Sequence, residues 1–141
     1  MNEHTKVFHG SCSEAFINGV REVLATKIEV KVTGDFEDSN FCGENATFPI
    51  YNGYSIEGTI TSKKKDSNLE LSITEGYRTG IMPDIVLMTS VGARSSSKRE
   101  RWSVSGVVFT EVALANIEAK KSGDRELPFK AVYFKNLEAV T

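Results

Sequence analysis

Cysteine, histidine, proline and long apolar runs are all scarce in this sequence of 141 residues. Two cysteines, Cys12 and Cys42, are too few for a disulfide framework. We expect free thiols and a reducing compartment, although one bridge between them stays open. No apolar run exceeds four residues, as in Ile85–Met88, whereas a membrane-spanning helix needs about 20. The sequence thus predicts no stable membrane anchor, and polar residues 1–10 predict no secretory leader.

An excess of charge of one sign is also missing. Lys and Arg number 17 and Asp and Glu number 19, which gives a net charge of −2. A dedicated nucleic-acid binder is usually clearly basic. The basic stretch 94–101 next to Trp102 could stack on bases, but Glu100 dilutes it at an expected hairpin tip. We therefore expect an exposed loop there and no sequence-specific nucleic-acid partner.

Residues that could carry chemistry are few and poorly spaced. The candidate metal ligands are His4, His9, Cys12 and Cys42. Their spacing matches no zinc motif, and phosphate-binding loops and nucleophile elbows are absent from the sequence. The carboxylates at 35–38 could pair for acid–base work, but a solvated or interface surface is the commoner use of such a cluster. We expect no catalytic residues, no metal, no cofactor and no enzyme activity.

The residues that are abundant favour strands. Val and Ile number 22 against seven Leu, and there are 11 Thr. Branched side chains lose rotamer freedom in helices and pack well on pleated surfaces. The length predicts a single domain over 1–141, with 1–11 as a flexible arm.

Two segments alternate between polar and apolar residues, as half-buried strands do. Ala15–Ile17 enters an expected tight turn at Asn18-Gly19, and a long strand is predicted over Val20–Thr33. Within that strand Ile28, Val30 and Val32 should face the core, and Lys27, Glu29 and Lys31 should face away. Tyr54–Thr61 alternates in the same way. Its inward residues are Ile56 and Ile60, and its outward residues are Ser55, Glu57, Thr59 and Thr61.

The remaining elements are read from caps and turns. A helix is predicted over 66–80, because Ser67 and Glu70 match a capping box and Gly80 suits the position after a helix. Further strands are expected over 85–91, 101–110, 112–118 and 127–137, with Pro128 at a strand start or on an edge. The total is about seven strands and one helix.

Residues 34–53 break the alternation and are predicted to be one long loop. Such loops are uncommon in compact domains and are often functional. This one holds four aromatic residues and several acids. The aromatic side chains pack either on their own domain or on a neighbouring subunit, where aromatic residues serve as anchors.

Several segments, in order across most of the chain, carry a resemblance to a known family. They are Phe16–Gly19, the strand through Val32, Asn40–Gly43, Gly53–Thr61, Gly80–Ile85, Glu100–Val107 and Glu126–Ala131. Together they resemble the tail tube proteins of contractile phages of Gram-positive hosts, and most of all the tubes of clostridial, diffocin-type phage-like bacteriocins (R-type bacteriocins).

The resemblance implies a fold and an assembly. The fold is mainly β, a β-sandwich or partly rolled β-barrel with one flanking helix. Six subunits would form a ring, and rings would stack into a rigid tube inside a sheath, together with baseplate and tape-measure proteins. The subunit would be made in the bacterial cytoplasm and assembled into a phage tail or a released bacteriocin particle, whose tube is driven through the target envelope.

The resemblance also assigns positions. Residues lining the lumen would be Lys27, Glu29, Lys31, Ser55, Glu57, Thr59 and Thr61, although an ordinary solvated outer face remains open for them. The loop would contact neighbouring subunits and rings through Asp35, Phe36, Glu37, Asp38 and Phe41. The alternatives are a secretion-system tube protein of similar fold and a monomeric ligand-binding β-barrel, which would contain a closed apolar pocket.

Overall fold

The computed structural model describes residues 13–21, 25–63, 67–93, 98–115, 118–119 and 123–140. The predictions for His4, His9, Cys12 and the flexible arm 1–11 lie outside these residues. Nine strands and one helix are described: β1 (Glu14–Ile17), β2 (Val20–Arg21), β3 (Ala25–Asn40), β4 (Thr47–Lys63), α1 (Asn68–Thr79), β5 (Leu87–Gly92), β6 (Arg99–Ser105), β7 (Val108–Phe109), β8 (Asp124–Ala131) and β9 (Tyr133–Glu138).

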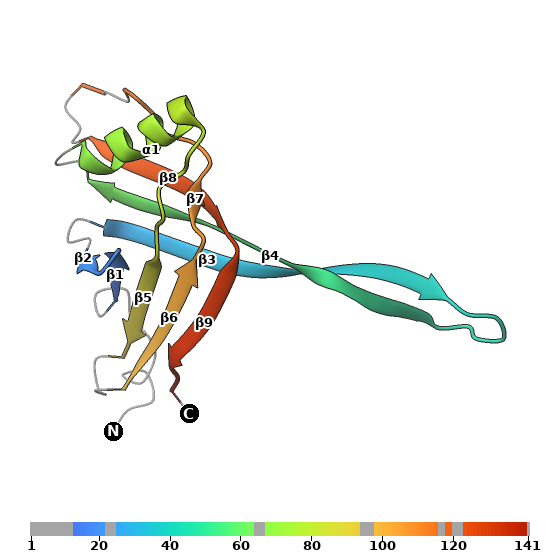
Figure 1. Ribbon diagram of the computed structural model, residues 1–141. Helices are drawn as coiled ribbons and strands as arrows, with labels where there is room; N and C mark the ends of the chain where they lie inside the picture. Colours follow the sequence, from blue (N-terminus) through green and yellow to red (C-terminus); the bar gives the residue numbers. More distant parts are fainter. Residues whose placement is uncertain are drawn as a thin grey trace.

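Two antiparallel sheets make up the fold (Figure 1). One has five strands in the order β2-β1-β5-β6-β9, and the other has four in the order β3-β4-β8-β7. The strands of the two sheets cross steeply, with α1 beside β8 (Figure 1). The predicted mainly-β sandwich with one flanking helix is confirmed, and the described residues do not close into a barrel.

The core lies between the sheets and beneath α1. Ile56 and Ile60 of β4 lie on the same face of the sheet as Leu127 and Phe129 of β8, and all four are buried. Phe129 also packs edge-on against Phe109, with ring centroids 6.1 Å apart. Burial of such side chains is the main favourable term in folding, and here it fixes which face of the four-stranded sheet points inward.

The prediction of a loop over 34–53 is wrong. Strands β3 and β4 stay paired as far as Asn40↔Thr47, and only 41–46 join them. The alternation breaks because a bulge interrupts the ladder: Asp35 pairs with Gly53 and Phe36 with Tyr51, which leaves Asn52 as an extra residue. Residues 34–53 therefore form a β-hairpin that projects far beyond both sheets (Figure 1). We call it the arm.

Two predicted strands are each divided by a corner at which the chain changes sheets. The segment 101–110 splits into β6 and β7 at Gly106, whose φ is 67°. The segment 127–137 splits into β8 and β9 at Val132, whose N–H donates to the Ser105 carbonyl at 3.2 Å. A Cβ on Gly106 would lie 3.0 Å from the Val132 side chain, so the two corners are packed together.

Two smaller predictions also fail. No strand occurs among the described residues of 112–118. Val32 is exposed rather than in the core, and it lies on the edge strand β3. Pro128 lies inside β8 rather than at a strand start, but on the edge side of that strand, which is the other position expected for it. Its carbonyl accepts a hydrogen bond from the Thr110 N–H, just past the end of β7. Proline has no N–H to donate, and here that donor is missing at a point where the ladder between β7 and β8 has already ended.

Helix α1 is confirmed, but its predicted capping box is not formed. Ser67 occupies the N-cap position without a side-chain hydrogen bond, while Gly80 ends the helix at φ 81° as expected. Glu70 turns inward instead and pairs with Arg125 of β8 at 3.0 Å, with both side chains more than nine-tenths buried. Arg125 Nε also donates to Ser62 Oγ at 3.2 Å. The ion pair thus ties α1 to β4 and β8.

The other end of α1 is held by Tyr77, whose hydroxyl donates to the Phe109 carbonyl. Burial raises the pKa of the Tyr77 hydroxyl above its usual value of 10.0, and the Glu111 carboxylate adds to the rise. The unfolded chain therefore loses this proton first as the pH increases. Stability should accordingly fall as the pH rises through 10, while below that value this group should leave stability independent of pH.

The buried ion pair gives the first testable prediction. Replacing one partner strands the other as an uncompensated buried charge. Arg125→Met should therefore lower the free energy of unfolding by about 3–5 kcal/mol, and Glu70→Leu in the same chain should restore much of it. Urea denaturation of the single and double variants measures both effects.

Arg78→Met is the matched control. Arg78 pairs with Glu75 on the same helix, at 3.7 Å, but both side chains are largely exposed. Its removal should change stability by less than about 1 kcal/mol. Equal decreases in the free energy of unfolding for Arg125→Met and Arg78→Met would contradict a special role for the buried ion pair.

Candidate assembly surfaces

The outer face of the four-stranded sheet is polar, and the structure brings the predicted lumen residues together on it. Strand pairing sets Lys27 opposite Thr61, Glu29 opposite Thr59, and Lys31 opposite Glu57. Ser55 follows opposite Thr33. The seven residues therefore share one face, and Ile28, Val30, Ile56 and Ile60 lie on the other. We call this surface the polar face.

Strand β8 extends the polar face with residues that sequence analysis had not assigned to it. Glu126 pairs with Thr61, Pro128 with Thr59, and Lys130 with Glu57. One more pair, Lys63 with Asp124, ends this face and forms an ion pair at 2.5 Å. Alternation in 126–131 indicates which residues of β8 point outward. The sequence of this segment does not indicate that β8 lies next to β4 in the sheet.

Gly58 lies at the floor of a shallow open depression on the polar face. The rim includes Lys31, Glu57, Thr59 and Lys130. A Cβ on Gly58 would lie 2.1 Å from the Glu29 carbonyl oxygen and 2.8 Å from the Phe129 ring. Glycine is therefore required here for Phe129 to pack under β4 and for β3 to pair alongside it.

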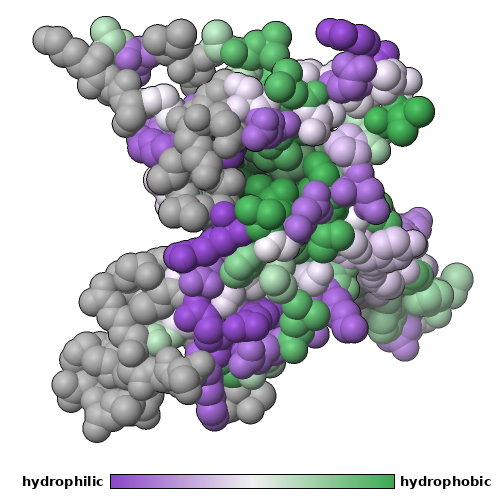
Figure 2. Space-filling view, turned by 60° about the vertical axis from the view of Figure 1, so that its left-hand side comes forward, coloured by the Kyte–Doolittle hydropathy of each residue, from purple (hydrophilic) through white to green (hydrophobic). Residues whose placement is uncertain are grey.

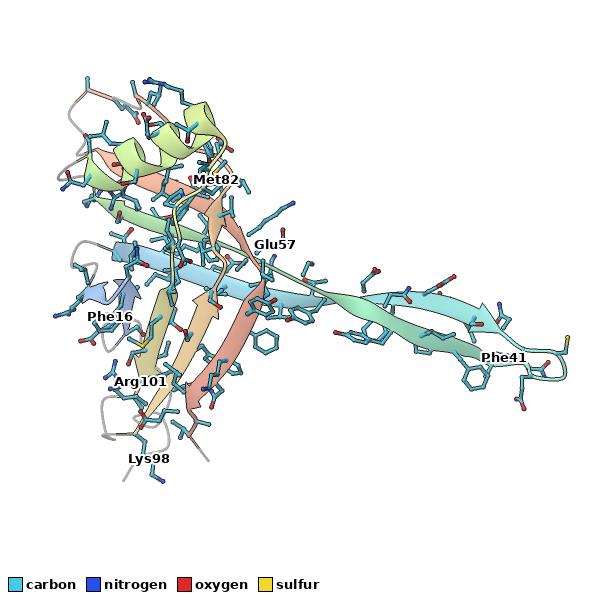
Figure 3. All side chains as sticks on the ribbon, in the orientation of Figure 1. Phe16, Phe41, Glu57, Met82, Lys98 and Arg101 are labelled. Carbon is cyan, nitrogen blue, oxygen red and sulfur yellow. The ribbon has the colours of Figure 1, made fainter. Side chains whose placement is uncertain are left out.

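The arm carries the five residues predicted to contact neighbours, on both of its faces. Asp35 and Glu37 continue the side of Lys31, whereas Phe36 and Asp38 continue the opposite side. Phe41 lies at the tip, and Glu57 lies where the arm leaves the body (Figure 3). The structure thus distributes these residues along the arm rather than gathering them into one patch.

Several large apolar side chains of the arm remain exposed. Phe36 pairs with Tyr51, and Phe41 pairs with Phe48, each with ring centroids 5.5 Å apart. Phe36 remains 59% exposed and Phe41 53% exposed. A two-stranded hairpin is only marginally stable alone in water. Exposed rings on such a hairpin are typical of a contact surface.

A second aromatic group lies at the base of the arm. Phe134 of β9 packs edge-on against Tyr54 at 5.4 Å and tilted against Trp102 at 6.1 Å. The Tyr54 hydroxyl donates to the Val132 carbonyl at 3.2 Å. These contacts brace the arm against the corner between the sheets, and sequence analysis did not identify them because the residues are far apart in the chain.

The four-stranded sheet has two different free edges. β3 is an edge strand along its whole length. On the other side, β7 pairs with Phe129 and Lys130 of β8, and no strand of the described residues pairs beside 124–127. Unpaired strand edges readily pair with another chain. The two edges are suited to joining one copy to the next.

The rest of the surface offers little for chemistry. Charged and apolar side chains are interspersed on the side turned away from the arm (Figure 2). Among the described residues, no group of three or more His, Cys, Asp or Glu is placed to hold a metal ion. Within that part of the chain, no helix has the length and hydropathy to cross a membrane.

Comparison with known proteins identifies a family. A family model described as phage tail tube protein matches residues 1–140. A search of curated protein sequences found no match.

Solved structures add a likeness of fold. A chain in the anti-feeding prophage cap, a tube terminating cap, has a TM-score of 0.75 at 10% identity, over 94% of this chain and 92% of that one. A chain in the sheath-tube complex of an extracellular contractile injection system, in the extended state, has a TM-score of 0.71 at 11% identity, over 94% and 93%. A chain in the virion of a native gene transfer agent has a TM-score of 0.60 at 11% identity, over 91% and 97%.

The close approach at Gly58 generates the second prediction. Gly58→Ala should lower the free energy of unfolding by about 1–3 kcal/mol, because the added methyl group overpacks the site. Thermal unfolding followed by circular dichroism measures the loss. Gly123→Ala is the control, since a Cβ there meets nothing within 4 Å. A Gly58 variant as stable as the Gly123 variant would contradict the tight packing of Phe129 under β4.

Proposed function

Because this chain belongs to the phage tail tube protein family, we propose that it is the ring-forming subunit of the inner tube of a contractile tail-like particle. The observation that carries the proposal is the combination of an exposed polar face, two unlike free edges on the same sheet, and a projecting apolar arm. Each of these features is unsatisfied in a single subunit.

The two free edges support a ring. An interface between unlike edges is heterologous, and repeated heterologous contacts close into a ring when the rotation permits. Joining β3 of one copy to the β7–β8 edge of the next would continue the sheet around an axis. Six copies would then enclose a bore. Closure removes the exposed edges that otherwise favour uncontrolled aggregation.

The polar face is the part of the sheet that suits a water-filled bore. Lys27, Glu29 and Lys31 extend from β3, while Ser55, Glu57, Thr59 and Thr61 extend from β4. The opposite face is committed to the core through Ile56 and Ile60, which are each 1% exposed. Of the two faces of this sheet, the polar face is therefore the one that is free to line a water-filled bore.

The arm supplies the contacts between neighbouring subunits and stacked rings. Its aromatic side chains would be buried by the next copy. Asp35, Glu37 and Asp38 would then select the docking site by charge. Assembly would also stabilise the hairpin itself, since each face of the arm would gain a packing partner.

The proposal includes partners beyond self-association. A tube of this kind works inside a sheath and grows from a baseplate to a length fixed by a tape-measure protein. The likeness to a chain of a sheath-tube complex supports the sheath as a partner. We propose a contractile particle of the clostridial bacteriocin type, made in the bacterial cytoplasm and released as an assembled particle, with a structural rather than enzymatic subunit.

Truncation of the arm tip tests this function. Phe41→Ala should leave the monomer folded, because the Phe41 ring packs against Phe48 at the end of the hairpin and lies outside the core. The same change should prevent tube growth. Negative-stain electron microscopy, after long incubation at high concentration or with sheath and baseplate proteins added, measures growth. Circular dichroism measures the fold.

Phe41→Tyr is the matched control, since it keeps a ring at the tip and should still assemble. Tubes of normal length from Phe41→Ala would contradict the role of the arm. Monomers alone from the unaltered chain, in the presence of its sheath and baseplate partners, would contradict the tube itself.

A further inference from the structure

The sequence contains two Asn-Gly pairs, and the structure holds them in different ways. They are Asn18-Gly19 and Asn52-Gly53. A glycine that follows asparagine has no side chain to restrict its backbone, so its nitrogen can approach and attack the asparagine side-chain amide. This is the route by which asparagine deamidates spontaneously. Both asparagines are exposed, and the contacts around each pair therefore decide which of them reacts.

Asn18 is fixed by two hydrogen bonds to the chain just before β5. Its backbone N–H donates to the Val86 carbonyl at 2.8 Å, and its side-chain Oδ1 accepts from the Val86 N–H at 2.8 Å. The turn is closed on both sides, because Ile17 pairs with Val20. Turning the Asn18 side chain toward the Gly19 nitrogen would leave the Val86 N–H without this acceptor. We therefore expect the first pair to be protected in the folded chain.

Asn52 is held more loosely, at the root of the arm. It is the extra residue of the bulge in β4, so the ladder gives it no opposite residue on β3. Its Nδ2 donates to Glu37 Oε2 at 3.5 Å, which is long for a hydrogen bond. Gly53 has a φ of 136°, and a Cβ there would meet nothing within 4 Å. An open depression lined in part by these two residues admits water to them.

We propose that Asn52 is a site of spontaneous deamidation in the folded subunit, and that the acid formed there loosens the root of the arm. The Gly53 nitrogen loses its proton to hydroxide and bonds to Asn52 Cγ. The Cγ–Nδ2 bond then breaks, and the amide nitrogen takes a proton from water and leaves as ammonia. Water opens the cyclic imide at either carbonyl carbon and gives aspartate or isoaspartate. The net change is one water consumed and one ammonia released.

The new carboxylate would change an attraction into a repulsion. The amide that donates to Glu37 is lost, and a negative charge takes its place beside Glu37 and near Asp35, which pairs with Gly53. Like charges at this range repel one another. Isoaspartate also adds a carbon atom to the backbone of β4 and so disturbs the register beyond the bulge. Neither the chemical step nor this local effect depends on the proposed function.

Incubation of the folded full chain at mildly alkaline pH and physiological temperature tests the chemical step. Peptide mass spectrometry follows conversion to the acid at positions 52 and 18 separately, and isoaspartyl methyltransferase measures isoaspartate. Asn52 should convert several-fold faster than Asn18 in the folded chain. In urea the two rates should become similar, because the bonds of Asn18 to Val86 are lost. Asn52→Gln should remove most of the methylation.

Two results would overturn the site. One is a folded chain in which Asn52 converts no faster than Asn18. The other is a ratio of the two rates that urea leaves unchanged, since the difference would then come from the flanking sequence rather than from the fold.

Limited proteolysis with chymotrypsin tests the loosening of the arm. Cleavage after Phe36 requires local opening of the ladder between β3 and β4. Asn52→Asp should be cleaved there several-fold faster than the unaltered chain at low salt, and Glu37→Gln added to it should remove most of the gain. Asn45→Asp is the matched control, because it adds the same charge in the segment 41–46 that joins the strands and should leave the rate unchanged. Equal rates for Asn52→Asp and the unaltered chain would overturn the loosening.

Discussion

The pairing of β3 with β4 is the interaction on which the rest of the molecule depends. Strand β3 (Ala25–Asn40) begins in the sandwich and ends in the projecting hairpin, and β4 (Thr47–Lys63) returns from the hairpin into the sandwich. The inner half supplies Ile56 and Ile60 to the core and holds β8 in place. The outer half becomes the arm. One continuous ladder of strand pairs therefore links the stability of the domain to the position of the arm.

The bulge at Asn52 explains why sequence analysis found the inner half of this ladder and missed the outer half. Up to Asp35, polar and apolar residues alternate against a core, and the pattern predicted the two faces of β3 and β4. The single strand predicted over Val20–Thr33 is wrong, because Val20–Arg21 belongs to one sheet and Ala25–Asn40 to the other. Beyond it, both sides of the hairpin meet solvent in the monomer, so one-sided alternation is no longer required. The extra residue on β4 also shifts the apolar positions of that strand to the opposite side. Aromatic content indicated that the segment packs on its own domain or on a neighbouring subunit, but it carried no information on its backbone.

Other predictions failed where a residue contacts a partner that is distant in the sequence. Glu70 fits a capping box within its own helix, but it is used by Arg125, which lies 55 residues away. The segments 101–110 and 127–137 each read as one strand, but at Gly106 and Val132 the chain passes from one sheet to the other. The sequence predicted seven of the residues on the polar face. Glu126 and Lys130 could not be assigned to it, because the neighbour of β4 is decided by topology rather than by local pattern.

The separation of charge between arm and polar face has a consequence for assembly. Association between copies that carry a common net charge is opposed by repulsion unless each charge meets a complementary group. The polar face carries equal numbers of Lys and acid in the paired rows of β3, β4 and β8, which removes that repulsion where six copies would converge on one axis. The acids of the arm lie away from the body of the subunit instead. A subunit built in this way can crowd its sheets around a narrow bore while its arm retains the charge needed to distinguish one docking site from another.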